Sequence, residues 1–191
     1  GLVVETLDGV NGRRPLVASV CGFPSGAHRA DVKAAEAAAA VADGVVEVDV
    51  VANLAAIAEG DWAQLADETA AVRRAIGPQV ALKVILETAA QRPDAVFDAC
   101  RVVVGEGADL VKTSTGFHPA GGATIEAVAA MATAVAGMSG GRGEAVGVKA
   151  SGGIRSASDA LAMVEAGATR IGASASRAIL DGLPASERWS A

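Results

Sequence analysis

The chain has 191 residues, 51% of them hydrophobic, which is the size of about one domain and excludes a disordered protein. Its formal net charge of −6 and its 3% aromatic content argue against binding to a nucleic-acid backbone or stacking on bases. Two cysteines fit a reducing cytoplasm, and no apolar run reaches the ~18 residues of a membrane span, so we expect a cytoplasmic protein without a signal peptide.

Short runs rich in β-branched residues alternate with alanine-rich stretches along the whole chain. Runs of this kind between turn signals are typical of strands in an α/β protein. We predict six strands, over residues 16–23, 45–52, 80–86, 108–115, 144–151 and 168–173.

The alanine-rich stretches between these runs carry the start and stop signals of helices. Asp61 and Thr124 stand at positions suited to N-caps, and Gly44, Gly107 and Gly167 follow as helix ends. We predict helices over residues 30–43, 62–76, 91–105, 123–137, 156–166 and 174–181.

Strand–helix–strand alternation without hairpin dipeptides predicts parallel strands joined by right-handed crossovers. The spacings from Gly44 to Gly107 and from Gly107 to Gly167 are 63 and 60 residues, each about two βα units. This regularity favours a (β/α)8 barrel forming a single domain over residues 1–191, with an open doubly wound sheet as the alternative. Only six of the eight units are visible, so we expect either that the barrel is incomplete at its N-terminal side or that it is atypical.

Three of the four lysines lie inside apolar strand runs, although lysine is normally found on solvated surfaces. They are Lys83, Lys112 and Lys149, and Asp49 lies in a similar apolar run. Asp49 follows Gly44 by five residues, and Lys112 follows Gly107 by five. Equivalent repeats would therefore place both side chains at one height, near the C-terminal mouth of the barrel where active sites are built.

Lys112 and Lys149 each begin a Lys-x-Ser pattern on consecutive strands, which predicts two ammonium groups side by side. An amine attacks a carbonyl only when neutral, and at a pKa near 10.4 about one lysine in 2,500 is neutral at pH 7. A neighbouring cation and desolvation lower such a pKa by roughly 3 units, which makes Schiff-base chemistry practical. Asp49 would serve proton transfers through a water. The alternative is a charge-balanced core layer.

Glycine-rich loops follow the last strands and predict a phosphate site. Backbone N–H groups at helix N-termini bind phosphate, and the loops after the last two barrel strands are its usual position. The predicted phosphate-binding residues are Gly121, Gly122, Gly152, Gly153, Gly172 and Ser174.

The other polar residues give weaker signals. Neither histidine has a partner at metal-ligand spacing, so we predict no metal site and no cofactor. Cys21 reads as a small core residue rather than a nucleophile. Glu47 should share the face of Asp49 and pair with Lys83, while Glu68 reads as part of a solvated helix face.

Six segments of the chain resemble the 2-deoxyribose-5-phosphate aldolase family in the same order and spacing, from about residue 15 to residue 183. The resemblance is most specific in Lys-Thr-Ser-Thr-Gly at 112–116 and Lys-Ala-Ser-Gly-Gly-Ile-Arg at 149–155. The remaining segments are Val-Cys-Gly-Phe-Pro-Ser-Gly at 20–26, Glu-Val-Asp-Val-Val at 47–51, Lys-Val-Ile-Leu-Glu-Thr at 83–88 and Gly-Ala-Thr-Arg-Ile-Gly-Ala-Ser at 167–174.

The resemblance implies a metal-independent class I aldolase on a (β/α)8 barrel, in which Lys112 is the Schiff-base lysine, Lys149 lowers its pKa and Asp49 is the acid/base group. It implies reversible cleavage of 2-deoxy-D-ribose 5-phosphate to D-glyceraldehyde 3-phosphate and acetaldehyde, in deoxyribonucleotide catabolism. The family's first two βα units have no counterpart in this sequence, and Phe117 stands where some members carry a phosphate-facing lysine.

Two other functions remain open at this point. One is a different Schiff-base sugar-phosphate aldolase, and the other is a truncated barrel that binds sugar phosphates without turnover. In either case the expected partner is a small sugar phosphate rather than a nucleic acid or a membrane, and a homodimer is left open.

Overall fold

A computed structural model describes residues 16–184, in which six strands form one sheet. All five neighbouring pairs are parallel, and the strands follow one another in chain order. The strands are β1 (Ala18–Cys21), β2 (Glu47–Val51), β3 (Ala81–Ile85), β4 (Leu110–Lys112), β5 (Gly147–Ser151) and β6 (Arg170–Gly172).

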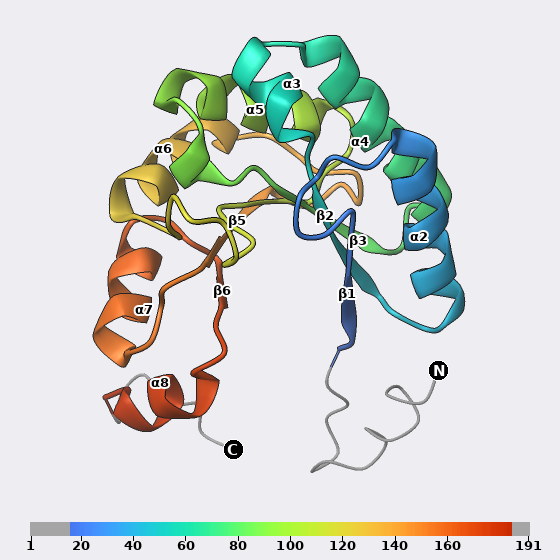
Figure 1. Cartoon of the computed structure of the whole chain (residues 1–191). Helices are drawn as coiled ribbons and strands as arrows, with labels where there is room; N and C mark the ends of the chain where they lie inside the picture. The colour runs from blue at the N-terminus through green and yellow to red at the C-terminus, as the bar shows by residue number, and fades with distance from the viewer. Residues whose placement is uncertain (1–15, 185–191) are drawn as a thin grey trace.

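Helices follow the strands and lie on the outer side of the arch that the sheet describes (Figure 1). They are α2 (Ala30–Ala42), α3 (Leu54–Glu59), α4 (Trp62–Ile76), α5 (Pro93–Gly105), α6 (Ile125–Val135), α7 (Ala157–Glu165) and α8 (Ser176–Gly182), with a short 3-10 helix at Thr88–Ala90. Among residues 16–184, no helix is both long and apolar enough to cross a bilayer.

The strand order identifies the architecture as part of a (β/α) barrel. A doubly wound sheet reverses its strand order at a switch point, whereas a barrel keeps chain order throughout. The observed order β1 to β6 is strictly sequential, so the barrel prediction is confirmed and the doubly wound alternative is wrong. Within the described residues β1 and β6 each have one neighbour, and they stand at the two ends of the arch (Figure 1).

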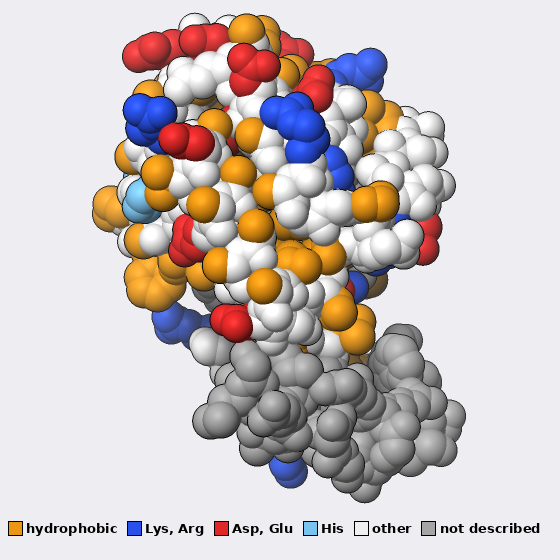
Figure 2. All heavy atoms as spheres, turned by 90° about the vertical axis from the view of Figure 1, so that its right-hand side faces the viewer, with side chains coloured by type: hydrophobic (Ala, Val, Ile, Leu, Met, Phe, Trp, Pro, Cys, Tyr) orange, Lys and Arg blue, Asp and Glu red, His pale blue; other side chains and the backbone are white. Residues whose placement is uncertain are grey.

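The two faces of the sheet differ in chemistry because side chains alternate along each strand. The face under the helices is apolar and forms the core, with Val48, Val50, Leu82, Val84 and Val111 all buried. The inner face carries most of the charged strand residues instead. In the view of Figure 2, acidic and basic side chains are scattered among hydrophobic and polar ones on the outer surface.

The predicted strands and helices all exist, but the strands are shorter than predicted, as with Leu110–Lys112 inside 108–115. Helix α3 was not predicted because its six residues are too few for a periodic pattern. Its ends are nevertheless well marked, since the Asn53 side chain caps the first turn and Gly60 adopts a left-handed conformation. Residues 1–15 and 185–191 lie outside the described residues, so a single domain over 1–191 stays a prediction.

Candidate active site

Four adjacent strands place charged side chains on the inner face of the sheet. Lys112 on β4 pairs in register with Lys149 on β5, and Asp49 on β2 pairs with Lys83 on β3. Residues paired in a parallel ladder point to the same face, so each pair projects inward together. The charged residues that the sequence places inside apolar strand runs therefore belong to one cluster.

The register also explains why Asp49 reaches Lys112 across an intervening strand. Lys112 pairs with Ile85, and Ile85 pairs with Val51, so the ladder places Asp49 two residues behind Lys112. A barrel of eight strands with a shear of eight shifts its register by about one residue per strand. A two-residue offset over two strands therefore brings both side chains to the same height, as the glycine spacing predicted.

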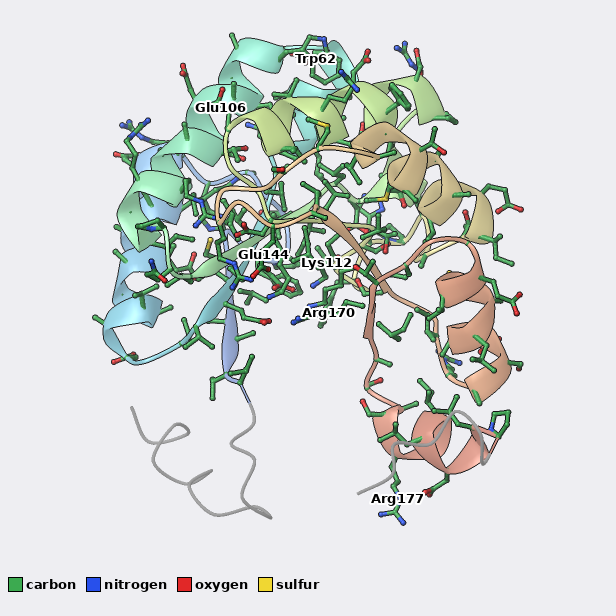
Figure 3. All side chains as sticks on the ribbon, turned by 180° about the vertical axis from the view of Figure 1, so that it is seen from behind. Trp62, Glu106, Lys112, Glu144, Arg170 and Arg177 are labelled. Atoms are coloured by element: carbon green, nitrogen blue, oxygen red, sulfur yellow. The ribbon has the colours of Figure 1, made fainter. Side chains whose placement is uncertain are left out.

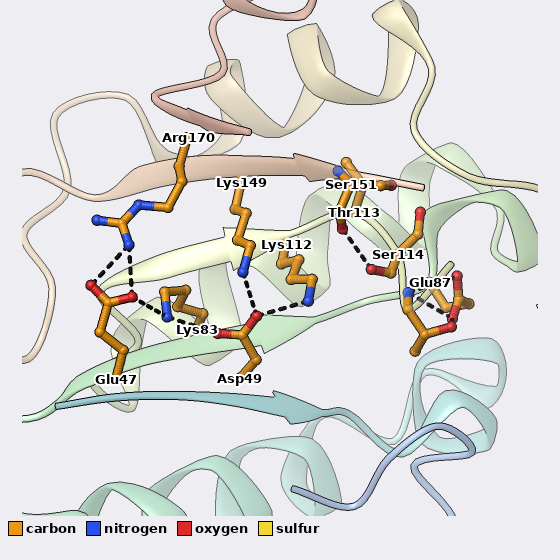
Figure 4. Close-up of polar contacts among 11 residues, drawn as sticks. Glu47, Asp49, Lys83, Glu87, Lys112, Thr113, Ser114, Lys149, Ser151 and Arg170 are labelled. Atoms are coloured by element: carbon orange, nitrogen blue, oxygen red, sulfur yellow. Dashed lines mark hydrogen bonds and ion pairs between the residues drawn. The ribbon is translucent and has the colours of Figure 1, made fainter. Parts of the chain in front are cut away.

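Asp49 is the centre of the cluster (Figure 4). Its Oδ2 atom accepts hydrogen bonds from Lys112 Nζ at 2.7 Å and from Lys149 Nζ at 2.6 Å, while Oδ1 accepts from Lys83 Nζ at 2.7 Å. Because Lys112 and Lys149 share one oxygen, their nitrogens lie within twice a hydrogen-bond length of each other. The prediction of two adjacent ammonium groups is confirmed.

The pKa values in this cluster reflect burial and close charges in competition. Burial raises the pKa of Asp49, but Lys112, Lys83 and Lys149 outweigh it and hold the pKa well below its usual range. Burial lowers the pKa of Lys149, with Asp49 opposing the shift and the two neighbouring lysines adding to it. Asp49 therefore stays ionised, while Lys149 sits where a positive charge is poorly accommodated.

A second layer of ion pairs lies nearer the N-terminal ends of the strands. Glu47 Oε2 lies 2.8 Å from Lys83 Nζ, which confirms the predicted pair, and it lies 2.7 Å from Nη1 of Arg170 on β6. Figure 3 shows Arg170 and Lys112 inside the concave side of the arch. With Arg170 included, four formal cations face the two carboxylates, which argues against a merely charge-balanced layer.

A cavity of about 440 Å³ opens above the lysines. Lys112 and Lys149 form its floor, and four of the six predicted phosphate residues line it, namely Gly152, Gly153, Gly172 and Ser174. The other two do not: Gly122 lines a neighbouring cavity with Gly152 and Gly153, and Gly121 lies outside both sets of lining residues. The structure thus brings the amines and the loops after β5 and β6 into one cavity.

Gly122 instead lets two loops touch. A Cβ atom there would collide with the backbone of Gly152, so the loops after β4 and β5 pack against each other only because neither carries a side chain at this point. The N–H of Ala123 donates to the Gly152 carbonyl at 3.1 Å and fixes the contact. Gly122 therefore shapes the cavity wall from behind.

Among the cavity-lining residues that were not predicted as site residues are Thr115, Phe117 and Arg155. The ring of Phe117 meets Phe23 edge to face, with centroids 5.4 Å apart, so the loops after β1 and β4 touch at the mouth. Arg155 follows the Gly152-Gly153 pair, and its exposed position in a loop resembles an ordinary surface arginine in the sequence. Only its place two residues after the glycine pair signalled a link to the cavity.

One prediction about a charged residue is wrong. Glu68 was expected on a solvated helix face, but it is buried on α4 and lies 2.7 Å from the Nζ of the buried Lys33 on α2. Burial raises the pKa of Glu68 and lowers that of Lys33, with each partner opposing the other's shift. The pair sits behind β2, where Lys33 also donates to the Val51 carbonyl at 2.7 Å, and it does not line the cavity.

Cys21 also lies behind the sheet. It is fully buried on β1, and burial raises the pKa of its thiol to about 12. A thiol with so high a pKa is almost entirely protonated at neutral pH and is a poor nucleophile. The prediction of a core cysteine is confirmed.

Comparisons with known proteins point to one family. Residues 13–182 match the family described as DeoC/LacD family aldolase. A deoxyribose-phosphate aldolase from Kocuria rhizophila is 52% identical over 182 residues, covering 95% of this chain and 78% of that protein. One from Corynebacterium diphtheriae is 58% identical over 167 residues, covering 87% of this chain and 73% of that protein.

Solved structures agree with the sequence comparison. The deoxyribose phosphate aldolase from Aeropyrum pernix, described as a tetramer, superposes with a TM-score of 0.74 at 34% identity. The match covers 87% of this chain and 67% of that one. A protein described as QR15, an aldolase, superposes with a TM-score of 0.79 at 37% identity, over 88% of this chain and 72% of that one.

Proposed function

Because the chain belongs to the DeoC/LacD family of aldolases, we propose that it reversibly cleaves 2-deoxy-D-ribose 5-phosphate to D-glyceraldehyde 3-phosphate and acetaldehyde. The single observation that carries the proposal is the contact of the buried Lys112 and the half-buried Lys149 with one carboxylate oxygen at the floor of a cavity. Deoxyribose-phosphate aldolases at 52% and 58% identity support the choice of substrate.

Lys112 is the proposed nucleophile. Its neutral amine adds to the aldehyde carbon of the sugar, and loss of water leaves a protonated imine. The C3 hydroxyl then loses its proton and the bond between C2 and C3 breaks. The electrons of that bond form an enamine on the lysine. Glyceraldehyde 3-phosphate leaves, the enamine takes up a proton, and water releases acetaldehyde and the free amine.

Lys149 and Asp49 are the proposed partners of Lys112. Lys149 brings a second amine beside Lys112 on the same Asp49 oxygen, and we propose that this crowding of like charges activates the pair for imine formation. Three lysines keep the Asp49 carboxylate ionised, which makes it a weak base. We therefore assign Asp49 to orienting the two amines and to passing protons through a water molecule, rather than to storing a proton.

The loops after β5 and β6 are the proposed phosphate cradle. Gly152, Gly153, Gly172 and Ser174 line the same cavity as the lysines, and glycine allows an anion to approach backbone N–H groups closely. Gly121 and Gly122 are assigned a supporting role behind this cradle. Phosphate binding would convert remote binding energy into orientation of the reacting carbons.

The proposal includes a class I mechanism that uses no metal or other cofactor, because a lysine amine supplies the electron sink. We further propose a role in cytoplasmic deoxyribonucleotide catabolism, with a small sugar phosphate as the partner. Activity in the presence of a strong chelator would support the metal-independent mechanism, and loss of activity that added metal restores would contradict it.

Borohydride trapping tests the proposed function. Reduction in the presence of acetaldehyde should add one ethyl group to the protein, and peptide mapping should place it on Lys112. Lys112→Ala should abolish the adduct, while Lys33→Arg serves as a control for a lysine outside the cavity. An adduct on another residue would contradict the assignment of Lys112.

The same preparation separates the two alternatives. A different Schiff-base aldolase would trap other donor aldehydes or ketones in preference to acetaldehyde. A barrel that only binds sugar phosphates would show no cleavage of deoxyribose 5-phosphate in a coupled assay for glyceraldehyde 3-phosphate.

A further inference from the structure

Glu87 has an unusual backbone conformation at the end of β3. Its φ of 52° and ψ of 57° place it in the left-handed region, and it is the only residue other than glycine with a positive φ among residues 16–184. A side chain with a Cβ is crowded in this region, so such a residue persists only where its surroundings impose the conformation. Glycine would adopt it without strain.

The Glu87 side chain is unusual as well, because it is a fully buried carboxylate with no cation within ion-pair distance in the described part of the chain. Its hydrogen-bond partner is Thr115, in the loop after β4. The N–H of Thr115 donates to Glu87 Oε2 at 3.1 Å, and the Thr115 hydroxyl donates to the same oxygen at 2.5 Å. A buried carboxylate is tolerated only with such hydrogen bonds.

The hydrogen bonds continue from Thr115 into the cavity wall. The Thr115 hydroxyl accepts a hydrogen bond from the N–H of Phe117 at 3.1 Å, so Glu87 orders the loop over residues 115–117. All three of these loop residues line the cavity with Lys112, whereas Glu87 itself does not. Glu87 is therefore placed to act on a substrate through the loop and not by contact.

We propose that Glu87 is a positioning residue that fixes the 115–117 loop as the wall of the substrate cavity and so sets the affinity for the sugar phosphate. The inference rests on the proposed function. Lys112 is held by the β4 ladder and by Asp49, so its own reaction with acetaldehyde does not depend on Glu87.

Three substitutions at Glu87 separate the effect of the carboxylate from the effect of the backbone. Glu87→Gln keeps a carbonyl oxygen that accepts from Thr115, so its KM for deoxyribose 5-phosphate should stay within about twofold of the parent. Glu87→Ala and Glu87→Gly both lose the acceptor of the two Thr115 hydrogen bonds, so both should raise KM by about tenfold. Borohydride trapping of acetaldehyde on Lys112 should remain in all three.

The alanine and glycine variants are matched controls for stability. Glycine relieves the left-handed strain that alanine retains, so Glu87→Gly should melt at a higher temperature than Glu87→Ala while sharing its KM. Equal KM values in these two variants, with rescue in Glu87→Gln, would support positioning. A KM that follows the melting temperature, or that stays at the parental value in all three, would overturn it.

The experiment also distinguishes this inference from the proposed function. If the parental protein neither traps acetaldehyde nor cleaves the sugar phosphate, the proposed function fails. If the parent does both and only the Glu87 variants behave otherwise than stated, the proposed function stands and the role of Glu87 is wrong.

Discussion

At the residue scale, the chemistry of this molecule depends on one aspartate that contacts three lysines. Asp49 satisfies Lys83, Lys112 and Lys149 with its two oxygens, so these ammonium groups compete for a single negative charge. The competition keeps two amines close together although like charges repel. Burial lowers the pKa of Lys149 against the opposing charge of Asp49, and the two neighbouring lysines add to the lowering.

Lys149→Leu tests this competition directly. Removal of the neighbouring ammonium takes away the charge that opposes a second cation, so the apparent pKa of the rising limb of kcat against pH should move up by about one unit or more. Lys149→Arg keeps the positive charge and is the matched control. An unchanged pH profile in Lys149→Leu would contradict the electrostatic argument.

Asp49 should also make stability depend on pH in acid. Its folded-state pKa is lowered from the usual 3.8, so the unfolded chain takes up the proton first and stability is lost as the pH falls below that value. Glu47, whose pKa is lowered from 4.5 by Lys83 and Arg170 against an opposing effect of burial, acts in the same sense.

The measurement is the free energy of unfolding in urea at pH values from about 5 down to about 2.5. Asp49→Asn and Glu47→Gln should each flatten this dependence, although Asp49→Asn should also be less stable at every pH because three lysines lose their counter-ion. A parental slope retained in both variants would show that these carboxylates do not control acid stability.

At the element scale, the sequence pattern predicted strands and helices well and failed where packing decides. Each inner-face lysine broke an apolar strand run, and this interruption is visible in the sequence. The ion pair of Lys33 with Glu68 is not visible, because residues 35 apart on two alanine-rich helices look like ordinary solvated charges. Burial arises only when α2 and α4 pack together behind β2, which is tertiary information.

The site residues divide in the same way, into those that the sequence predicts and those that only tertiary packing reveals. The Lys-x-Ser patterns predicted the floor of the cavity, and the glycine-rich loops predicted part of its lining. The role of Gly122 could not be predicted, because it depends on the close approach of two loops. Glu87 could be placed at the end of a strand from the sequence, but neither its left-handed backbone nor its contact with Thr115 leaves a sequence signal.

Lys33→Met should destabilise the packing of α2 on α4. It leaves the Glu68 carboxylate buried without its cation, and breaking a buried pair in this way costs about 3–5 kcal/mol. Thermal or urea unfolding measures the loss. The double variant Lys33→Met with Glu68→Leu removes both charges and should recover most of the stability, whereas a double variant as unstable as the single one would contradict this account.

At the scale of the whole molecule, an ion pair connects strands that are not neighbours. Arg170 on β6 reaches Glu47 on β2 across the inside of the arch, 123 residues away in the chain. The hydrogen-bonded ladder alone would allow the sheet to open or close by small changes at each strand. This contact restrains the curvature over four successive strand pairs.

Arg170→Gln should weaken that restraint. The arginine side chain is 44% exposed, so solvent screening limits its contribution to about 1 kcal/mol, measurable as a lower urea midpoint. Arg177→Gln, at an exposed pair on α8, is a control that should leave the midpoint unchanged. Equal midpoints for Arg170→Gln and the parent would show that the curvature does not depend on this ion pair.

The excess of cations on the inner face has a consequence for substrate capture. The protein as a whole is negative, with a net charge of −6, and therefore repels phosphate esters at a distance. On the concave side four basic side chains face two carboxylates, so a molecule that reaches the mouth should meet an excess of formal positive charge. Low-dielectric walls concentrate such a field, so anions would be drawn inward over a short range and the association rate should vary steeply with ionic strength.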